Sequence, residues 1–411
     1  MRGGTIKSAK SYMAEAVNID FISKASIIEQ ASMSGGTFLF FLFAARAAGS
    51  EAFGLFTLLY VPIQVLHSIA AQWVLLPITT SKFTEVLIIS VSKRFLAISF
   101  LSPVMAYAFS ILTSVDFNLS FAGGVALGGT LLIAFDALRY LTIRLERNSH
   151  QIFVNFTRWF VSLGCVIVLS YGTHFTYWDI LLCFALGQLI GCCFSVLFLA
   201  KNSLEYDTDI KESEAKEQNG IAFFLFGSAN GLFTIAMTSA LASISVGALG
   251  AIQSFRSLFN IVPLVLQFVE THYVSSVMRT RGSKLLSRPI YVVFAFLILI
   301  IFFIVGGSEA AIVRSIYGES FVPYSGLLAP VMALILLQSV LRILLLEIRV
   351  SNMRNAIFAL LVPLLIGVAV LFSFSKLPAN AAAVSIIIFV NLIVILQALV
   401  AFGFLYRRSG G

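Results

Sequence analysis

Polar side chains form a stripe along one predicted helix, over residues 243–272. They are three or four residues apart, so they share one face of an α-helix whose other residues are mostly apolar. A stripe of this kind faces protein or water rather than lipid, and its arginine stays charged and offers paired donors that fit phosphate oxygens. Its members are Gln253, Arg256, Asn260, Gln267 and Glu270, with Pro263 among them.

A second stripe follows the predicted helix at 54–78. When Gly54 is aligned with Gly250, an offset of 196 residues, three members of this stripe align with Gln253, Arg256 and Asn260. The fourth aligns with Pro263. Two equivalent helices would then present polar faces at equivalent positions. The simplest arrangement directs both faces into one central cavity. The members of this stripe are Thr57, Tyr60, Gln64 and His67.

Arg256 is the strongest candidate for a binding residue. A charged side chain near the centre of a bilayer costs about 3 kcal/mol on insertion scales, so we expect it to have a functional partner. The alternative is a buried ion pair with Glu270 or Glu29 that holds helices in register.

Three other arginines are further candidates for the cavity, each with a structural alternative. Arg342 lies near the cytoplasmic end of its helix and could extend to the interface instead. Arg158 lies two turns into its helix beside Trp159, and Arg46 ends the first helix, where the outer interface is the alternative.

Three carboxylates are candidate sites for a coupling proton or cation. They are Glu29, Asp136 and Glu270. Asp136 could equally pair with Arg139 or Tyr140 on its own helix.

The elements that carry these residues are expected to be membrane helices. The chain has 411 residues, of which 59% are hydrophobic and 11% are charged. Since a bilayer core needs about 20 apolar residues per spanning helix, we predict an all-α membrane protein with about twelve transmembrane helices. They form two parallel six-helix bundles around a central cavity. The predicted helices cover 25–48, 54–78, 95–114, 121–143, 151–171, 179–200, 220–241, 243–272, 289–308, 324–348, 355–375 and 380–405.

The distribution of basic residues predicts the orientation. If both termini are cytoplasmic, 21 of the 27 Lys and Arg residues lie in cytoplasmic segments, as the positive-inside rule requires. The outer segments hold Arg46, Arg314 and Lys376. The net charge of +8 therefore indicates membrane topology and no binding of nucleic acid.

One polar stretch divides the chain into two halves. We predict a cytoplasmic segment at 1–24, an N-terminal lobe at 25–200, a cytoplasmic linker at 201–219 and a C-terminal lobe at 220–411. The segment IRLERNSHQIF at 143–153 matches IRVSNMRNAIF at 348–358. Both are predicted to be cytoplasmic, so the repeat is parallel, as in a known plan of transporters.

Enzyme signatures are missing from the sequence. There is no GxxxxGK[ST] motif, and the four cysteines lie in apolar segments without a CxxC pair. We therefore expect no catalytic activity, no cofactor and no metal site.

The segment RAAGSEAFGLF at 46–56 resembles a signature of polysaccharide transporters in the multidrug/oligosaccharidyl-lipid/polysaccharide (MOP) flippase superfamily. Arg46, Gly49, Phe53 and Gly54 occupy its matching positions. The segments VGALGAIQSFRSLFNIVP at 246–263 and IYGESF at 316–321 are similar to the eighth helix and a later connector of that family.

The resemblance implies a two-lobed bundle with a cavity open alternately to each side of the bacterial inner membrane. Members of the polysaccharide branch, the Wzx-like flippases, move oligosaccharides linked to polyprenyl pyrophosphate. Arg256 falls where the family often has a basic cavity residue. The implied partners are the lipid-linked oligosaccharide, membrane lipid, and the polysaccharide polymerase and chain-length proteins. The alternatives are a cation-coupled multidrug exporter of the same superfamily and a membrane scaffold of a polysaccharide-assembly complex.

Overall fold

The computed structural model describes residues 9–75, 85–113, 119–144, 148–172, 174–201, 220–259, 308–351, 353–371 and 379–409. Every regular element in these ranges is helical. In chain order they are α1 (Ala9–Ala70), the π-helical turn η1 (Ala71–Leu75), α3 (Glu85–Thr113), α4 (Leu119–Arg144), α5 (Asn148–Ser170), α6 (Tyr177–Lys201), α7 (Gly220–Ala242), α8 (Val246–Leu258), α11 (Glu309–Tyr317), the 3-10 helix η2 (Glu319–Leu327), α12 (Leu328–Ser351), α13 (Met353–Leu371) and α14 (Ala379–Ser409).

Seven helical stretches in the described ranges are long and apolar enough to cross a membrane. The first has 48 residues, which is enough for two crossings of about 20 residues each. The prediction of an all-α membrane protein is confirmed. The stretches are Ile28–Leu75, Val91–Ile111, Leu119–Ile143, Ser149–Ser170, Tyr177–Lys201, Glu319–Arg342 and Ala381–Leu405.

Eleven of the twelve predicted helices coincide with described helices. The ninth, at 289–308, lies outside the described residues apart from its last residue, as does the end of the eighth beyond residue 259. The linker predicted at 201–219 also lies outside them, apart from Lys201.

The first two predicted helices are the two arms of α1, joined by a sharp corner at Gly49. There φ is +78° and ψ is 172°, a conformation that is open essentially to glycine alone. The two arms fold back on each other, and the ring centroids of Phe41 on the first arm and Tyr60 on the second lie 5.2 Å apart. The first arm begins at Ala9 rather than at residue 25, so the helix extends into the segment predicted to precede it.

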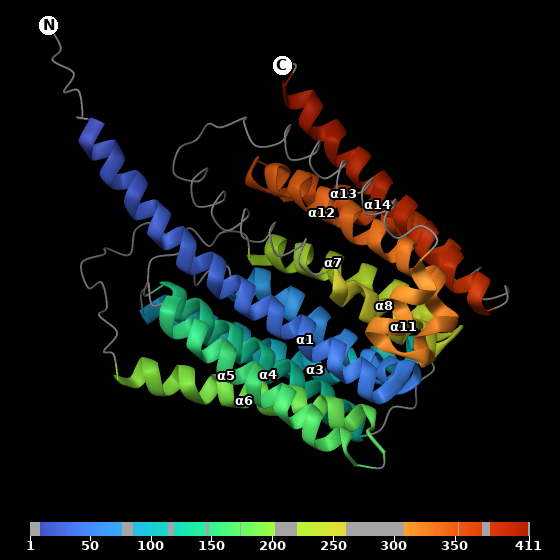
Figure 1. The fold of residues 1–411 in the computed structure, drawn as a ribbon. Coiled ribbons are helices and arrows are strands. Elements are labelled where there is room, and N and C mark those ends of the chain that lie inside the picture. Colours follow the sequence, from blue (N-terminus) through green and yellow to red (C-terminus); the bar gives the residue numbers. More distant parts are fainter. Residues whose placement is uncertain are drawn as a thin grey trace, which may run out of the picture.

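The elements form two groups along the chain, which Figure 1 shows side by side. Helices α1 and α3–α6 make up one group, and α7, α8 and α11–α14 make up the other. Helix α1 joins the groups because it packs against α7 and α8 as well as against α4, α5 and α6. The start of α1 and the end of α14 lie toward the same end of the bundle (Figure 1).

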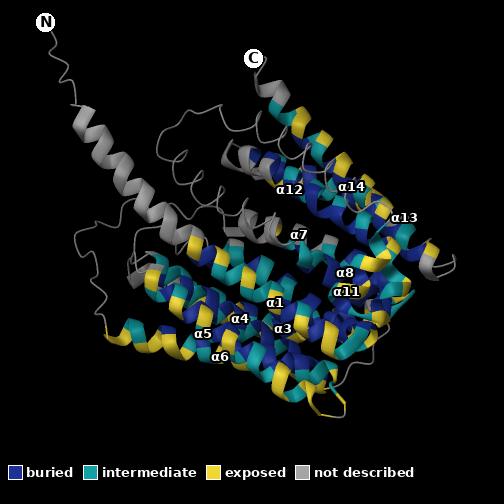
Figure 2. Cartoon of the chain, in the orientation of Figure 1, coloured by how far each residue is buried: buried dark blue, intermediate teal, exposed yellow. Residues whose placement is uncertain are grey.

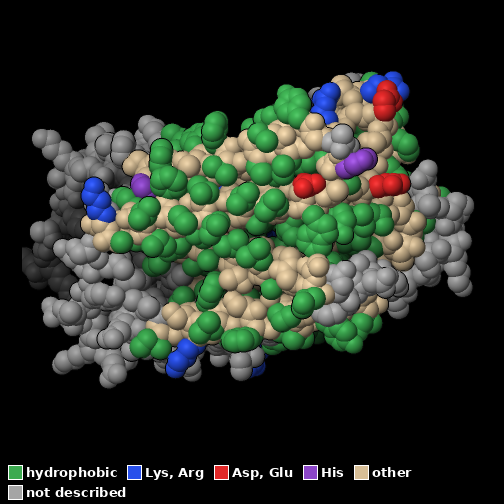
Figure 3. Space-filling model, turned by 90° about the horizontal axis from the view of Figure 1, so that it is seen from below, with side chains coloured by type: hydrophobic (Ala, Val, Ile, Leu, Met, Phe, Trp, Pro, Cys, Tyr) green, Lys and Arg blue, Asp and Glu red, His purple; other side chains and the backbone are tan. Residues whose placement is uncertain are grey.

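Burial follows the contacts between helices. Buried residues face neighbouring helices and exposed residues face outward (Figure 2). Large apolar side chains are exposed on the outer faces, including Phe100 at 77% and Phe160 at 79%. Figure 3 shows hydrophobic side chains spread over one such face, with few charged side chains among them. This surface is suited to contact with lipid tails.

The boundary between α7 and α8 is short and well defined. Helix α7 ends at Ala242, and Ser245 caps α8 by accepting a 3.2 Å hydrogen bond from the backbone N–H of Ala248. The cap fixes the residue at which α8 begins.

Candidate functional site

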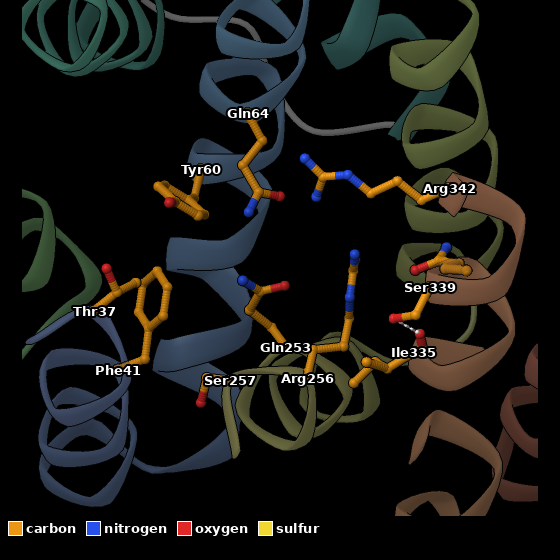
Figure 4. Close-up of a pocket in the computed structure, with 11 residues that line it drawn as sticks. Thr37, Phe41, Tyr60, Gln64, Gln253, Arg256, Ser257, Ile335, Ser339 and Arg342 are labelled. Atoms are coloured by element: carbon orange, nitrogen blue, oxygen red, sulfur yellow. Dashed lines mark hydrogen bonds between the residues drawn. The ribbon is translucent and has the colours of Figure 1, made fainter. Parts of the chain in front are cut away.

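A cavity of about 290 Å³ lies between the two groups of helices. One wall comes from both arms of α1 and the other comes from α8 and α12 (Figure 4). The α1 wall consists of Thr37, Phe41, Tyr60 and Gln64. The opposite wall consists of Gln253, Arg256, Ser257, Ile335, Gln338, Ser339 and Arg342.

The described lining of the cavity is cationic. It includes the guanidinium groups of Arg256 and Arg342 and contains no carboxylate. Both side chains extend toward the same space, with Gln64 and Gln253 beside it (Figure 4). Arg342 is exposed and Arg256 is partly buried. Two positive charges surrounded by amide and hydroxyl groups favour a ligand with negative charge and several hydrogen-bonding groups.

Helical periodicity explains how the α12 side of this wall arises. Ile335, Gln338, Ser339 and Arg342 are spaced by three, one and three residues, which places them on one face of the helix. The Ser339 hydroxyl donates to the Ile335 carbonyl at 2.7 Å.

The aromatic rings of the α1 wall are held by other rings. Tyr60 stacks on Phe56 with centroids 5.5 Å apart and meets Phe184 edge-on at 5.5 Å. Phe41 meets Phe53 edge-on at 6.0 Å. Tyr60 and Phe41 are almost fully buried, so the rings form a fixed wall.

Glu29 lies in a buried polar network away from this cavity. Arg139 of α4 binds it with two hydrogen bonds, of 2.6 Å from Nε and 2.9 Å from Nη2. Asn155 of α5 also donates to Glu29 Oε1 at 3.0 Å, and Arg139 donates to Gln30 Oε1 at 2.6 Å. The network ties the first arm of α1 to α4 and α5. Glu29 is therefore engaged by Arg139, and the alternative that Arg256 pairs with Glu29 is wrong.

Asp136 joins the same network from α4. One of its oxygens lies 2.5 Å from His67 Nε2 on the second arm of α1, and the other lies 3.8 Å from Arg139 Nη1. The alternative partner Arg139 is thus present, and His67 is an additional one. The Asp136 side chain is only 6% exposed whereas that of His67 is 33% exposed. His67 is not among the residues that line the cavity in the described part of the chain.

Arg158 is fully buried between α5 and its neighbours. Its guanidinium carbon lies 4.2 Å from the ring centre of Phe135 and 4.1 Å from that of Trp159. It donates to Gln188 Oε1 and to Met33 Sδ, each at 3.0 Å. These contacts place Arg158 inside the N-terminal group of helices and away from the central cavity.

Arg46 lies at the corner of α1 and not on the cavity. It donates from Nη1 to the carbonyls of Ser315 and Ile316, at 3.1 and 3.3 Å. These carbonyls belong to the last turn of α11. Asn260, Gln267 and Glu270, which complete the predicted stripe, lie outside the described residues.

Comparisons with known proteins give matches only among solved structures. No family model and no curated protein sequence matches the chain. The lipid II flippase MurJ, in an inward closed conformation, is similar with a TM-score of 0.63 and 14% identity, over 94% of this chain and 87% of that chain. An inward-facing multidrug transporter of the MATE family, from the MOP superfamily, is similar with a TM-score of 0.58 and 14% identity, over 93% of this chain and 97% of that one.

A third similar structure is a MOP-superfamily transporter from Pyrococcus furiosus, for which a reversed polarity of the binding pocket suggests a different function. Its TM-score is 0.52 with 13% identity, over 92% of this chain and 93% of that chain. The chain has the fold of the MOP-superfamily transporters.

Within this MOP fold, several cavity residues were not predicted from the sequence. Thr37, Phe41, Ser257 and Ser339 belong to this group, together with Gln338 and Ile335. The α12 residues carried a usable signal, because Gln338, Ser339 and Arg342 share one helical face. The α1 residues carried none, since Thr37 and Phe41 are unremarkable in an apolar helix.

Proposed function

We propose that the chain is a flippase of the bacterial inner membrane, with both termini in the cytoplasm, and that it moves oligosaccharide linked to polyprenyl pyrophosphate to the outer leaflet by alternating access. The observation that supports this most is the cavity between the two groups of helices, whose described lining holds Arg256 and Arg342 but no carboxylate.

The proposed substrate matches this lining in charge and in hydrogen bonding. A pyrophosphate group is anionic and accepts hydrogen bonds in pairs, which suits guanidinium donors. Gln253 and Gln338 add amide groups that can bind sugar hydroxyls. The polyprenyl tail would remain in the bilayer, where the outer helix faces are apolar.

The structural neighbours are compatible with more than one substrate class. MurJ is a flippase of lipid II, and the MATE transporter is a multidrug transporter. The cationic lining favours an anionic lipid-linked head in this chain over a cationic drug.

A cation-coupled multidrug exporter would require a carboxylate that is available to a cation. The two described candidates are already engaged, Glu29 by Arg139 and Asp136 by His67 and Arg139. Both carboxylates thus have basic partners within the N-terminal group of helices. This arrangement supports the flippase over the exporter.

Lipid analysis of a deletion strain tests the proposal. We expect the lipid-linked oligosaccharide to accumulate on the cytoplasmic side and the surface polysaccharide to be lost, with both restored by the intact gene. Sensitivity to cationic drugs without any change in lipid-linked oligosaccharide would overturn the flippase and support the exporter.

A further inference from the structure

The second arm of α1 and the start of α8 cross at a contact between two backbones. A Cβ atom added to Gly54 would lie 2.1 Å from the carbonyl oxygen of Val246. A Cβ atom added to Gly250 would lie 2.2 Å from the carbonyl oxygen of Ser50. Both separations are far below contact distance, so only glycine fits at either position in this arrangement.

The two contacts are reciprocal. Gly54 and Gly250 are 196 residues apart, and so are Ser50 and Val246. Each glycine therefore lies against the carbonyl one helical turn before the other glycine. Because the obstructing atoms are backbone atoms, a side-chain rotation cannot relieve a clash. Any added atom must move one helix relative to the other.

A second set of contacts joins the two groups of helices beside this crossing. Arg46, from the first arm of α1, donates to the Ser315 and Ile316 carbonyls at the end of α11. A helix carries partial negative charge at this end, which favours a guanidinium there. Helix α11 is itself fixed to α8, because the Tyr317 hydroxyl donates to the Ser254 carbonyl at 2.7 Å. Burial raises the pKa of the Tyr317 hydroxyl and keeps it protonated as a donor.

The crossing lies at one end of the cavity. Gln253 and Arg256 follow Gly250 by one and two helical turns, and Tyr60 and Gln64 follow Gly54 by about two and three turns. Both helices therefore run from the crossing into the cavity walls. We propose that the Gly54–Gly250 crossing, secured by the Arg46 bonds to α11, is the closed outer gate of this cavity and must separate before the cavity opens outward.

The proposal rests on the proposed transport function, and it makes a specific prediction about access. Gly54→Ala and Gly250→Ala strain the closed gate and leave the separated state unstrained. A strain of about 1.4 kcal/mol in the closed state shifts the equilibrium between the closed and the separated gate about tenfold. We therefore expect either variant to raise the outward-open population about tenfold and to lower the inward-open population.

The experiment measures access to the cavity from each side. Ser339→Cys is introduced into full-length protein whose four cysteines, Cys165, Cys183, Cys192 and Cys193, are replaced. A membrane-impermeant maleimide is applied to vesicles of each orientation. The glycine variants should speed outer labelling and slow inner labelling. Unchanged labelling in folded variants, or faster labelling from the side of the termini, would overturn the proposal.

A matched glycine controls for general loosening. In Gly128→Ala the added atom meets the side-chain tip of Ile63 at 2.7 Å, within the N-terminal group of helices. A flexible tip can move aside, so this variant should leave the sidedness of labelling unchanged. If Gly128→Ala raised outer labelling as much as Gly54→Ala does, the crossing would have no special role.

A second variant keeps the test valid if the glycine variants fail to fold. The Arg46 side chain is exposed, and Arg46→Gln removes its hydrogen bonds to the carbonyls of α11. This variant should also raise outer labelling. Arg314→Gln is the matched control, because Arg314 forms an exposed ion pair with Glu319 at 2.7 Å in the same region. Equal labelling of the two arginine variants would overturn the role of Arg46. The labelling requires no substrate, so its outcome is separate from that of the lipid analysis.

Discussion

At the scale of single residues, two of the four arginines that were predicted to line the cavity do so. Arg256 and Arg342 come from α8 and α12, and both line the cavity. Arg158 and Arg46 carry the same charge but lie away from the cavity. Arg158 contacts the Phe135 ring and donates to Gln188, and Arg46 donates to a carbonyl at the end of α11. Charge type alone therefore does not separate the arginines that line the cavity from those that lie elsewhere in the structure.

The first prediction concerns Arg256. Hydrogen bonds to charged groups are worth about 1.5–3 kcal/mol, so Arg256→Ala should lower transport about ten- to a hundredfold. Arg256→Lys keeps the charge but loses the paired donors, and it should give an intermediate rate. The measurement is transport of lipid-linked oligosaccharide per folded molecule in vesicles. Normal transport by well-expressed Arg256→Ala would end the hypothesis that this residue binds substrate.

The second prediction concerns the buried pair of Glu29 and Arg139. Removal of one partner from a buried ion pair costs about 3–5 kcal/mol, and Glu29 is the carboxylate to which Arg139 donates two hydrogen bonds. Glu29→Gln should therefore lower the folded fraction after extraction, and Glu29→Gln with Arg139→Gln should recover part of it. The measurement is the monodisperse fraction in size-exclusion chromatography.

Arg314→Gln is the control for this pair, because exposed ion pairs contribute about 0–1 kcal/mol. Its folded fraction should match that of the unaltered chain. A well-folded Glu29→Gln that had lost dependence on a cation gradient would contradict the structural role and support ion coupling by Glu29.

At the scale of elements, sequence periodicity located most helices but not their joints. The break between the first two helices was predicted over residues 49–53, and the structure concentrates it in Gly49. Helix α11 was not predicted, and only the last four residues of η2 fall within a predicted helix, at 324–348. Each of the two has nine residues, and hydropathy detects only stretches long enough to span a bilayer. The Glu29–Arg139 pair was also missed. Its members are 110 residues apart, and no local pattern connects them.

The third prediction concerns the corner of α1. Backbone conformations open essentially to glycine cost other residues about 1–3 kcal/mol, so Gly49→Ala should destabilise the hairpin formed by the two arms. We expect a lower midpoint of thermal unfolding in detergent. Gly123→Ala is the control, since Gly123 lies within α4 and an added Cβ meets no atom within 4 Å. A midpoint for Gly49→Ala equal to that of the control would contradict the strain.

At the scale of the whole molecule, composition and hydropathy were sufficient for the fold class. They indicated an all-α membrane protein, and the resemblance of short motifs indicated the MOP fold, which the similar solved structures share. The division into lobes at 201–219 stays a prediction, as does the orientation in the membrane. Neither the substrate nor the packing of the halves follows from hydropathy, because both depend on side chains that meet only in three dimensions.

The fourth prediction concerns orientation. The excess of Lys and Arg in alternate connectors predicts that both termini and the linker are cytoplasmic. In a background without native cysteines, Ser213→Cys should react with an impermeant maleimide only from the inside and Asp116→Cys only from the outside. Reaction of both from the same side would contradict the twelve-helix topology.

The paired arginines of the cavity also have an electrical consequence. On the proposal above, the closed crossing of Gly54 and Gly250 forms a barrier between the cavity and the outside, and we expect the membrane voltage to fall mainly across this barrier. On the proposed function, Arg256 and Arg342 balance the two negative charges of a bound pyrophosphate diester. The substrate and the two arginines together then carry almost no net charge when the loaded protein reorients. Each unbalanced charge instead contributes about 2.3 kcal/mol per 100 mV. The reorientation of the loaded, unaltered protein should therefore depend little on membrane potential, whereas the reorientation of a loaded variant that lacks one arginine should become voltage-dependent.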